Sequence, residues 1–336
     1  LQDALGKDFA KGTDGQKIAD LYRSYVDMDA RNQHGIEPVK KQLADIQAVK
    51  NLKGLYDYFV KYGSVGGNPF FGGYVGTHMK NSAINTVYLG GGGLGLGRTY
   101  YQKEDAKDTE TLADYQQFIN SLFPAFGQKT RDLKGPGIVA FEKSIAAKLK
   151  TVEEQRDANK RYNPVAVKDL GGLVKNMDVA AYLKTMGFKA DTVIIGELKY
   201  YQELDEILNE QNLPIIKEYL SFHVMDGATG YLTKDLEDLS FDFYGKKLRG
   251  QNEQRALDKR GLEFVNGNVG ELLGKLYVAA YYPEEAKQTC EELVGYLRKS
   301  VDAHIRGLAW MSPATQEKAL EKLNKFTVKI GYPDKW

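Results

Sequence analysis

Apolar residues recur every three to four positions along most of the chain, a period that predicts α-helices. Residues 13–35 give the first example, with five apolar side chains on one face: Ile18, Leu21, Tyr22, Tyr25 and Val26. Thr13, followed three residues later by Gln16, predicts a capping box at the start of this helix. Gly35 predicts its end.

The same period continues through two more helices. One begins near Glu37 and Pro38, because proline is tolerated in the first helical turn. It turns three apolar side chains inward: Val39, Leu43 and Ile46. The next carries its apolar stripe on Leu55, Tyr58, Phe59 and Tyr62. These patterns predict a helical N-terminal region.

Residues 68–97 interrupt the helical period. Two short runs, FFGGYVG and AINTVYL, flank the turn-like HMKNS, and this arrangement predicts a β-hairpin near residues 69–89. Helical periodicity resumes near Thr109 and continues to about Lys325. No fixed repeat or linker-like composition marks a domain boundary. The expected fold is therefore mainly α: one large, irregular multi-helical domain over residues 1–336, with one small β-hairpin.

The last predicted helix has a clear start. Ser312 is a favourable N-cap, and Pro313 suits the first helical position. The residues after Lys325, FTVKIGYPDKW, predict a short extended segment.

Composition and charge exclude some classes of function. The chain holds 46 basic and 45 acidic residues, so its net charge of +1 gives no reason to expect binding to nucleic acid or anionic membranes. No apolar run approaches the ~20 residues that span a bilayer. The first residues, LQDALGKDFAKGTDG, do not form a signal peptide, although the chain does not begin with Met and an upstream signal or anchor stays an alternative.

Three glycines resemble a nucleotide-binding motif. Gly90, Gly92 and Gly95 spell G-x-G-x-x-G after a predicted strand. A dinucleotide site needs a helix that opens at once, whereas convincing helical periodicity here waits until Thr109. Alternating strands and helices are also missing from the pattern, so we expect a flexible or structural turn.

The histidines do not predict a metal site. His34, His78, His223 and His304 are not followed by Glu, and no two lie four residues apart as H-E-x-x-H requires. His34 is placed to interact with the last carbonyls of a helix, and His223 and His304 fit core or surface roles. We therefore predict no metal ligand in this chain.

Three other groups carry residue types used in catalysis. Ser221, His223 and Asp226 point in different directions on a helix, so a triad is not expected. Cys290 is alone and fits a small packed side chain. The acidic stretch DLEDLSFDF predicts a solvated loop, although a carboxylate pair built by the tertiary fold stays open. Its carboxylates are Asp235, Glu237, Asp238 and Asp242. No catalytic residue is predicted, and substrate-binding residues stay unknown.

Four collinear segments resemble the N-terminal half of the neprilysin and endothelin-converting-enzyme family of zinc endopeptidases. They are KNSAINTVYLGGGGLGLGRTYYQ, YNPVAVKDLGGLV, FDFYGKKLRGQNEQRALDKRGLEFVNGNVGELLGKLYVAAYYPEEAK and WMSPATQEKALEKLNKFTVKIGYPDKW. The chain departs from the family pattern at Gly97, where Pro is usual, at Thr99, where Asp is usual, and at Gly261, where vertebrate members have a disulfide cysteine. The last departure fits a bacterial type.

The resemblance implies a helical domain that faces a zinc-containing catalytic domain of the same polypeptide across a chamber for oligopeptides. It also implies that H-E-x-x-H and the third zinc ligand lie beyond the position of Trp336, so zinc belongs to the parent enzyme and this chain alone is inactive. A periplasmic or extracellular location is expected. The alternative is a standalone helical module that binds peptides or a protein without enzymatic activity.

Overall fold

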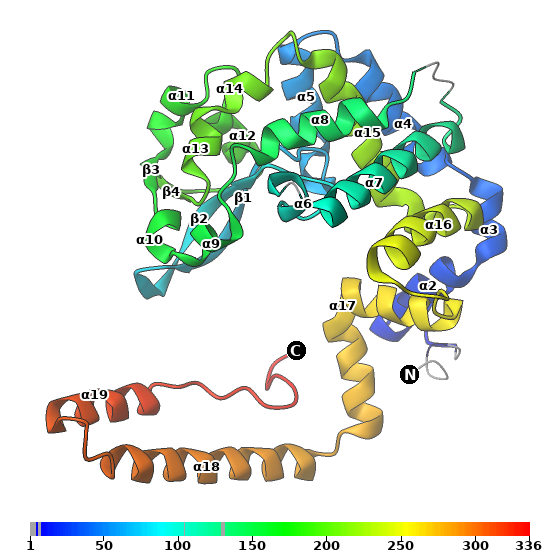
Figure 1. Cartoon of the computed structure of the whole chain (residues 1–336). Helices are drawn as coiled ribbons and strands as arrows, with labels where there is room; N and C mark the ends of the chain where they lie inside the picture. Colours follow the sequence, from blue (N-terminus) through cyan, green and yellow to red (C-terminus); the bar gives the residue numbers. More distant parts are fainter. Residues whose placement is uncertain (1–4, 6–7, 104, 129–131) are drawn as a thin grey trace. The chain divides into compact units, whose positions relative to one another are not determined.

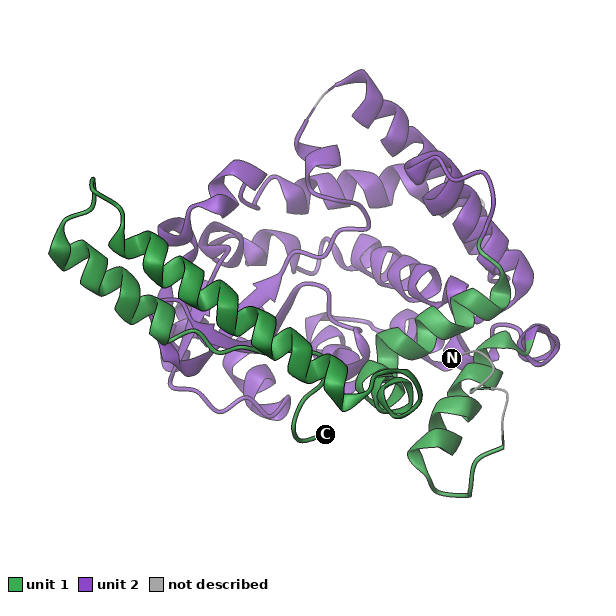
Figure 2. Ribbon diagram, turned by 90° about the horizontal axis from the view of Figure 1, so that it is seen from below, with its two compact units in different colours: residues 1–27, 255–336 green, residues 28–254 purple. Residues whose placement is uncertain are grey.

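The computed structural model describes residues 5, 8–103, 105–128 and 132–336. Contacts divide the chain into two compact units, residues 1–27 with 255–336 and residues 28–254 (Figure 2). Both are mainly helical, which confirms the predicted fold class. Compact units are not necessarily independent folding domains, so the single domain stays a prediction.

The first predicted helix is two helices, which corrects the expectation of one helix over residues 13–35. α2 (Asp14–Val26) ends at Asp27, where ψ is 80°, and α3 (Met28–His34) follows. Aspartate is a weak former of helix interiors, so apolar spacing alone did not reveal this break. The predicted ends hold: Thr13 accepts a hydrogen bond from the Gln16 amide, and Gly35 has φ +58°.

Residues 28–254 begin with the helices that the sequence predicted. After α3 come α4 (Glu37–Ala48) and α5 (Leu52–Tyr62), whose apolar stripes enter the core. Three long helices, α7 (Ala106–Ala125), α8 (Gly135–Ala146) and α15 (Leu213–Ala228), pack against one another (Figure 1). Their mutual packing places aromatic rings such as Phe118 and Phe222 in edge-to-face contact.

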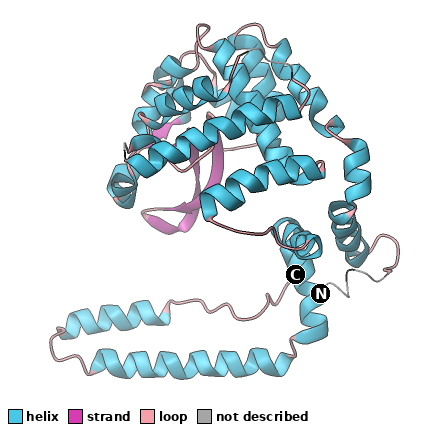
Figure 3. Ribbon diagram, turned by 45° about the vertical axis from the view of Figure 1, so that its right-hand side comes forward, coloured by secondary structure: helices cyan, strands magenta, loops and turns pink. Residues whose placement is uncertain are grey.

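The hairpin prediction is confirmed, but the sheet is larger than expected. β1 (Phe71–His78) and β2 (Asn81–Gly91) are antiparallel, and β4 (Thr192–Ile195) pairs parallel with β2 (Figure 3). β3 (Pro164–Ala166) completes the order β1-β2-β4-β3. Strands of three or four residues are too short to give a reliable alternation, so sequence reasoning missed the last two.

One row of valines crosses the whole sheet. Val75 pairs with Val87, Val87 with Val193, and Val193 with Val165, so all four lie on one face. Val87 and Val193 are buried, whereas Val75 at the β1 end is 61% exposed. The row therefore runs from the core to the surface at the edge strand.

Short helices connect these elements. α6 (Thr99–Gln102) begins ten residues before the predicted restart of helical structure, and α7 begins three residues before it. The remaining helices of this unit are α9 (Val152–Arg156), α10 (Ala158–Arg161), α11 (Leu170–Leu173), α12 (Val179–Thr185), α13 (Leu198–Gln202), α14 (Leu204–Ile207) and α16 (Lys234–Ser240). Three short 3-10 turns cover Gly63–Val65, Val167–Asp169 and Thr229–Tyr231.

The acidic stretch DLEDLSFDF is helical, so the predicted solvated loop was wrong. It forms most of α16 and the start of a π-helix (Phe241–Lys247). Thr233 accepts a hydrogen bond from the Leu236 amide at the N-terminus. Asp235 and Glu237 occupy the first turn, where their negative charge interacts favourably with the positive end of the helix dipole.

Residues 1–27 and 255–336 form the second unit. α2 packs on α17 (Leu257–Tyr281), with a small core of Leu5, Ile18, Val265 and Leu273. A Cβ atom at Gly261 would lie 2.6 Å from Val26 Cγ1, so glycine permits the close approach of the two helices. α18 (Glu284–Arg306) and α19 (Pro313–Asn324) form a helical hairpin (Figures 1 and 2). Ser312 caps α19, as predicted.

Candidate functional site

Tyrosines hold the glycine-rich segment in place. The Tyr200, Tyr201 and Tyr219 hydroxyls donate to the carbonyl oxygens of Phe70, Gly90 and Gly93, at 2.8, 2.5 and 2.5 Å. Each of these tyrosine side chains is buried. Tyr201 and Tyr219 therefore fix the glycine-rich segment at Gly90 and Gly93, so it is a structural turn, and Tyr200 fixes Phe70 beside it.

Glu142 of α8 fixes the next part of the same segment. Its Oε1 accepts from the Gly95 amide at 2.9 Å, and its Oε2 accepts from the Tyr101 hydroxyl at 2.8 Å. The Leu96 amide donates in turn to the Tyr101 oxygen at 3.1 Å. Glu142 is fully buried, so its carboxylate takes the place of water as a hydrogen-bond acceptor. It binds the Gly95 amide directly and supports the Leu96 amide through the Tyr101 hydroxyl.

Three further ionisable side chains, His223, Asp226 and Tyr244, lie near Glu142. His223 Nε2 is 3.5 Å from Glu142 Oε1, a charge contact that is too long for a good hydrogen bond. The Tyr244 hydroxyl donates to Asp226 Oδ2 at 2.9 Å. Burial raises the pKa of Asp226 to about 6, against the opposing effects of the Tyr244 hydrogen bond and His223. We call Glu142, His223, Asp226, Tyr101 and Tyr244 the buried polar cluster.

The buried polar cluster was missed by sequence reasoning, although one signal was present. Glu142 lies on the same helical face as Ile138 and Ile145, both fully buried, so a charge interrupts an apolar stripe. Such a residue requires a partner in the fold. Its partners Tyr101, Gly95 and His223 lie 41, 47 and 81 residues away in the sequence, and no local pattern links them to Glu142.

The nucleotide motif does not fit a phosphate site. Gly90 and Gly93 have carbonyls bound by tyrosines, and the Gly93 amide donates to Pro69 at 2.9 Å. The Gly95 amide is bound by Glu142, and a Cβ there would meet the Tyr115 oxygen at 1.6 Å. The glycines therefore allow close packing and tight turns, not an approach to pyrophosphate.

Ser221, His223 and Asp226, for which no triad was expected, contact different partners. Ser221 Oγ accepts from Gln47 Nε2 at 3.2 Å, whereas His223 faces Glu142. Cys290 is half-buried on α18, in keeping with a packed side chain.

Three of the four carboxylates of DLEDLSFDF have cationic neighbours. Glu237 is buried and pairs with Arg31 at 3.5 Å, and Asp242 pairs with Lys246 at 2.6 Å. Asp238 pairs with Lys234. These contacts hold helices and turns in place.

The four histidines lie on separate elements: His34 ends α3, His78 ends β1, His223 is on α15 and His304 is on α18. Within residues 5, 8–103, 105–128 and 132–336, no three His, Cys, Asp or Glu side chains gather as a metal site. No helix in that part of the chain combines the length and apolar character needed to cross a bilayer.

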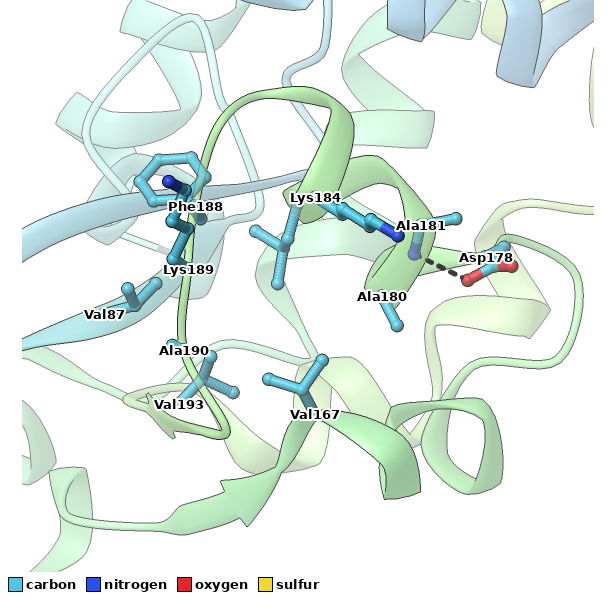
Figure 4. A pocket seen from close by; sticks show the side chains of 11 residues that line it. Val87, Val167, Asp178, Ala180, Ala181, Lys184, Phe188, Lys189, Ala190 and Val193 are labelled. Carbon is cyan, nitrogen blue, oxygen red and sulfur yellow. Dashed lines mark hydrogen bonds between the residues drawn. The ribbon is translucent and has the colours of Figure 1, made fainter.

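A pocket of about 440 Å³ lies between the sheet and α12 (Figure 4). Its apolar wall consists of Val87, Val167, Leu183, Phe188, Ala190 and Val193. Lys184, Lys189 and Asp178 stand at its margin. Asp178 caps α12, accepting from the Ala181 amide at 2.8 Å. Sequence reasoning did not predict this pocket, because its wall joins four segments.

A second surface is the apolar face of α18. None of the 23 residues of this helix is buried, although the helix is amphipathic. Four of its large apolar side chains are 45 to 58% exposed: Leu293, Tyr296, Leu297 and Val301. Their spacing places them on one face, and exposed apolar patches of this kind mark contact surfaces.

Comparisons with known proteins agree on one family. The family model described as "Peptidase family M13" matches residues 1–333. The chain is 28% identical to a neutral endopeptidase of Lactobacillus helveticus, over 100% of this chain and 54% of that protein. It is 24% identical to neprilysin-1 of Trittame loki, over 99% of this chain and 49% of that protein.

Solved structures show the same likeness. A zinc metalloprotease of Mycobacterium tuberculosis, in complex with an inhibitor, is similar with a TM-score of 0.89 and 29% identity, over 99% of this chain and 51% of that one. The PepO protein of Lactobacillus rhamnosis HN001, at 22% identity and a TM-score of 0.87 over 97% and 52%, is similar in fold. The chain thus spans about half the length of the curated relatives that it matches.

Proposed function

The chain belongs to peptidase family M13, and we propose that it is the non-catalytic helical part of a zinc endopeptidase. In this proposal it forms the wall of a chamber in which a catalytic domain of the same polypeptide cleaves oligopeptides. The names of its relatives, a neutral endopeptidase and a zinc metalloprotease, support a protease as the whole protein.

The observation that carries the proposal is the apolar face of α18. A standalone module has no missing partner and is expected to cover such a face, because large exposed apolar patches promote aggregation. Here Leu293, Tyr296 and Leu297 are all more than half exposed on consecutive turns. A catalytic domain that packs on this face would remove them from water, at about 25 cal/mol for each Å² buried.

We divide the catalytic roles between the two domains according to which residues could bind the metal. Zinc would activate a water molecule for attack on the peptide carbonyl. The described residues offer no matching ligand set, so we assign the metal and the catalytic base to the other domain. This chain would exclude bulky substrates and shield the reaction from bulk water. The buried polar cluster would keep the glycine-rich segment and α8 rigid within that wall.

Two preparations test the proposal: this chain alone, and the polypeptide that continues from it through H-E-x-x-H. We expect the longer polypeptide to bind zinc and to cleave a quenched oligopeptide. The chain alone should do neither, and added catalytic domain should bind it through α18. Stoichiometric zinc together with peptide hydrolysis by the chain alone would refute the proposal.

The standalone module makes a different prediction. It requires a stop codon directly after Trp336 in the native gene and a monomer that stays soluble without a partner. Location outside the cytoplasm, in the periplasm or medium, remains part of the proposal, and fractionation of the source cells would test it.

A further inference from the structure

The pocket between the sheet and α12 combines an apolar floor with positive charge. Val87 and Val193 lie side by side on one face, because their strands pair in register. Phe188 and Ala190 close the pocket from the segment after α12 (Figure 4). The floor suits an aliphatic group, since only apolar side chains from the sheet face inward there.

Two lysines give the margin its charge. Lys184 and Lys189 are exposed and make no ion pair with any residue that the structure describes. Asp178 is the acidic side chain of the pocket, and its carboxylate already caps the N-terminus of α12. The margin therefore carries a net positive charge that complements an anionic group.

An edge strand next to the pocket favours an extended peptide over other aliphatic anions. A Cβ at Gly73 of β1 would lie 2.9 Å from Leu183 and 3.1 Å from Phe188, so the pocket wall touches β1. β1 is the edge of the sheet, and its outer side pairs with no other strand of the described chain. Such an edge offers backbone donors and acceptors to a peptide strand.

We propose that this pocket holds an aliphatic side chain of an extended oligopeptide. The carboxylate of an acidic residue two positions along, on the same face of the peptide strand, is bound by Lys184 and Lys189. The proposal deepens the proposed function and rests on it, because it makes the helical domain a substrate-recognition surface and not only a wall. The volume of about 440 Å³ lies at the small end of ligand pockets, which suits one or two residues.

The probe is a fluorescent, end-blocked Gly-Leu-Gly-Asp-Gly peptide, with binding to this chain followed by fluorescence anisotropy. Two comparison peptides replace the acidic residue by lysine or the leucine by serine. We expect each comparison peptide to bind about tenfold more weakly, a change that corresponds to one lost interaction of moderate strength. Decanoate, an aliphatic anion without a peptide backbone, should compete poorly.

Three variants locate the site. Lys184→Glu with Lys189→Glu should weaken binding of the acidic peptide about tenfold and favour the lysine peptide instead. Ala180 of α12 also lines the pocket, so Ala180→Leu fills it and should weaken the binding of all the peptides. Lys50→Glu changes an exposed lysine that lies outside the pocket and should change nothing. Circular dichroism checks that each variant is folded.

The outcomes separate this inference from the proposed function. Absent peptide binding, tighter binding of decanoate, or equal affinities in the pocket variants and Lys50→Glu would each overturn the pocket assignment. None of these results affects zinc binding or hydrolysis by the longer polypeptide, which test the proposed function. Conversely, hydrolysis by this chain alone would refute the proposed function even if the pocket binds peptide.

Discussion

The Tyr101 hydroxyl donates a hydrogen bond of 2.8 Å to Glu142 Oε2, and this contact joins α6 to the middle of α8. Glu142 also accepts from the Gly95 amide, so one carboxylate fixes the turn that leads into α6. Burial and the Glu142 charge both raise the pKa of Tyr101, which therefore stays protonated and able to donate. The strongest predictions about stability concern this network.

Glu142→Leu should destabilise the chain by about 3 kcal/mol, because it leaves the Gly95 amide and Tyr101 hydroxyl buried without their acceptor. Urea unfolding followed by circular dichroism measures the change. Glu110→Leu, at an exposed position of α7, is the control and should change stability by less than about 0.5 kcal/mol. Equal midpoints for the two variants would show that the network does not stabilise the fold.

Gly95→Ala should be severely destabilising, by more than about 2 kcal/mol, since its Cβ would lie 1.6 Å from the Tyr115 oxygen. Gly97→Ala is the matched control two residues away, where the nearest atom to a new Cβ is 3.8 Å distant. We expect a thermal midpoint close to that of the unmodified chain for Gly97→Ala. A similar midpoint for Gly95→Ala would contradict the close packing described here.

The raised pKa of Asp226 predicts that the free energy of unfolding depends on pH. Its folded-state pKa of about 6 lies above its ordinary value of 3.8, so the folded state keeps a proton that the unfolded state has lost. This contribution is complete below about pH 4 and is lost as the pH rises to about 6, with a size of about 3 kcal/mol.

Asp226→Asn isolates this effect, because asparagine has no titrating carboxyl and can still accept from Tyr244. Its stability relative to the unmodified chain should increase between pH 4 and pH 6 and then level off. Denaturant titrations at half-unit pH intervals measure the difference. A difference that does not change across this range would mean that Asp226 is not held in its protonated form.

Leu293→Gln with Leu297→Gln should leave the free energy of unfolding within about 0.5 kcal/mol, since both side chains are already exposed. The same change should reduce self-association of the isolated chain and abolish binding of a separately produced catalytic domain. Sedimentation velocity measures both. Leu273→Gln, at a buried position in α17, is the contrasting variant and should destabilise the unit instead.

A catalytic domain that still binds the double variant with unchanged affinity would place the contact elsewhere. The α18 face would then need another explanation, and the observation that carries the proposed function would be lost.

Several features could be predicted from local sequence because local chemistry determines them. Thr13 and Ser312 start helices through side-chain oxygens that accept from amides three residues later. Gly35 ends α3 because glycine readily adopts a positive φ. The hairpin followed from two apolar runs around a short turn, and family membership followed from four collinear segments.

Other features were not predicted, because a single local residue or a distant partner outweighed the apolar pattern. Asp27 interrupts a stripe that reads as one helix, and DLEDLSFDF is helical despite its charge, since Thr233 caps it and Arg31 pairs with Glu237. β3 and β4 exist because they pair with each other and with β2, not because their few residues have a strong pattern.

The sequence by itself determined the helical class, the helix caps, the hairpin and the family, since each depends on residues within a few positions or on the order of segments. Only the tertiary structure decided that Glu142 anchors the glycine-rich segment, that α18 presents an uncovered apolar face, and that Val87, Val193 and Phe188 enclose a pocket. The physical reason is that burial, a hydrogen-bond partner and a cavity wall are properties of neighbours in space, and chain folding brings those neighbours together from distant positions.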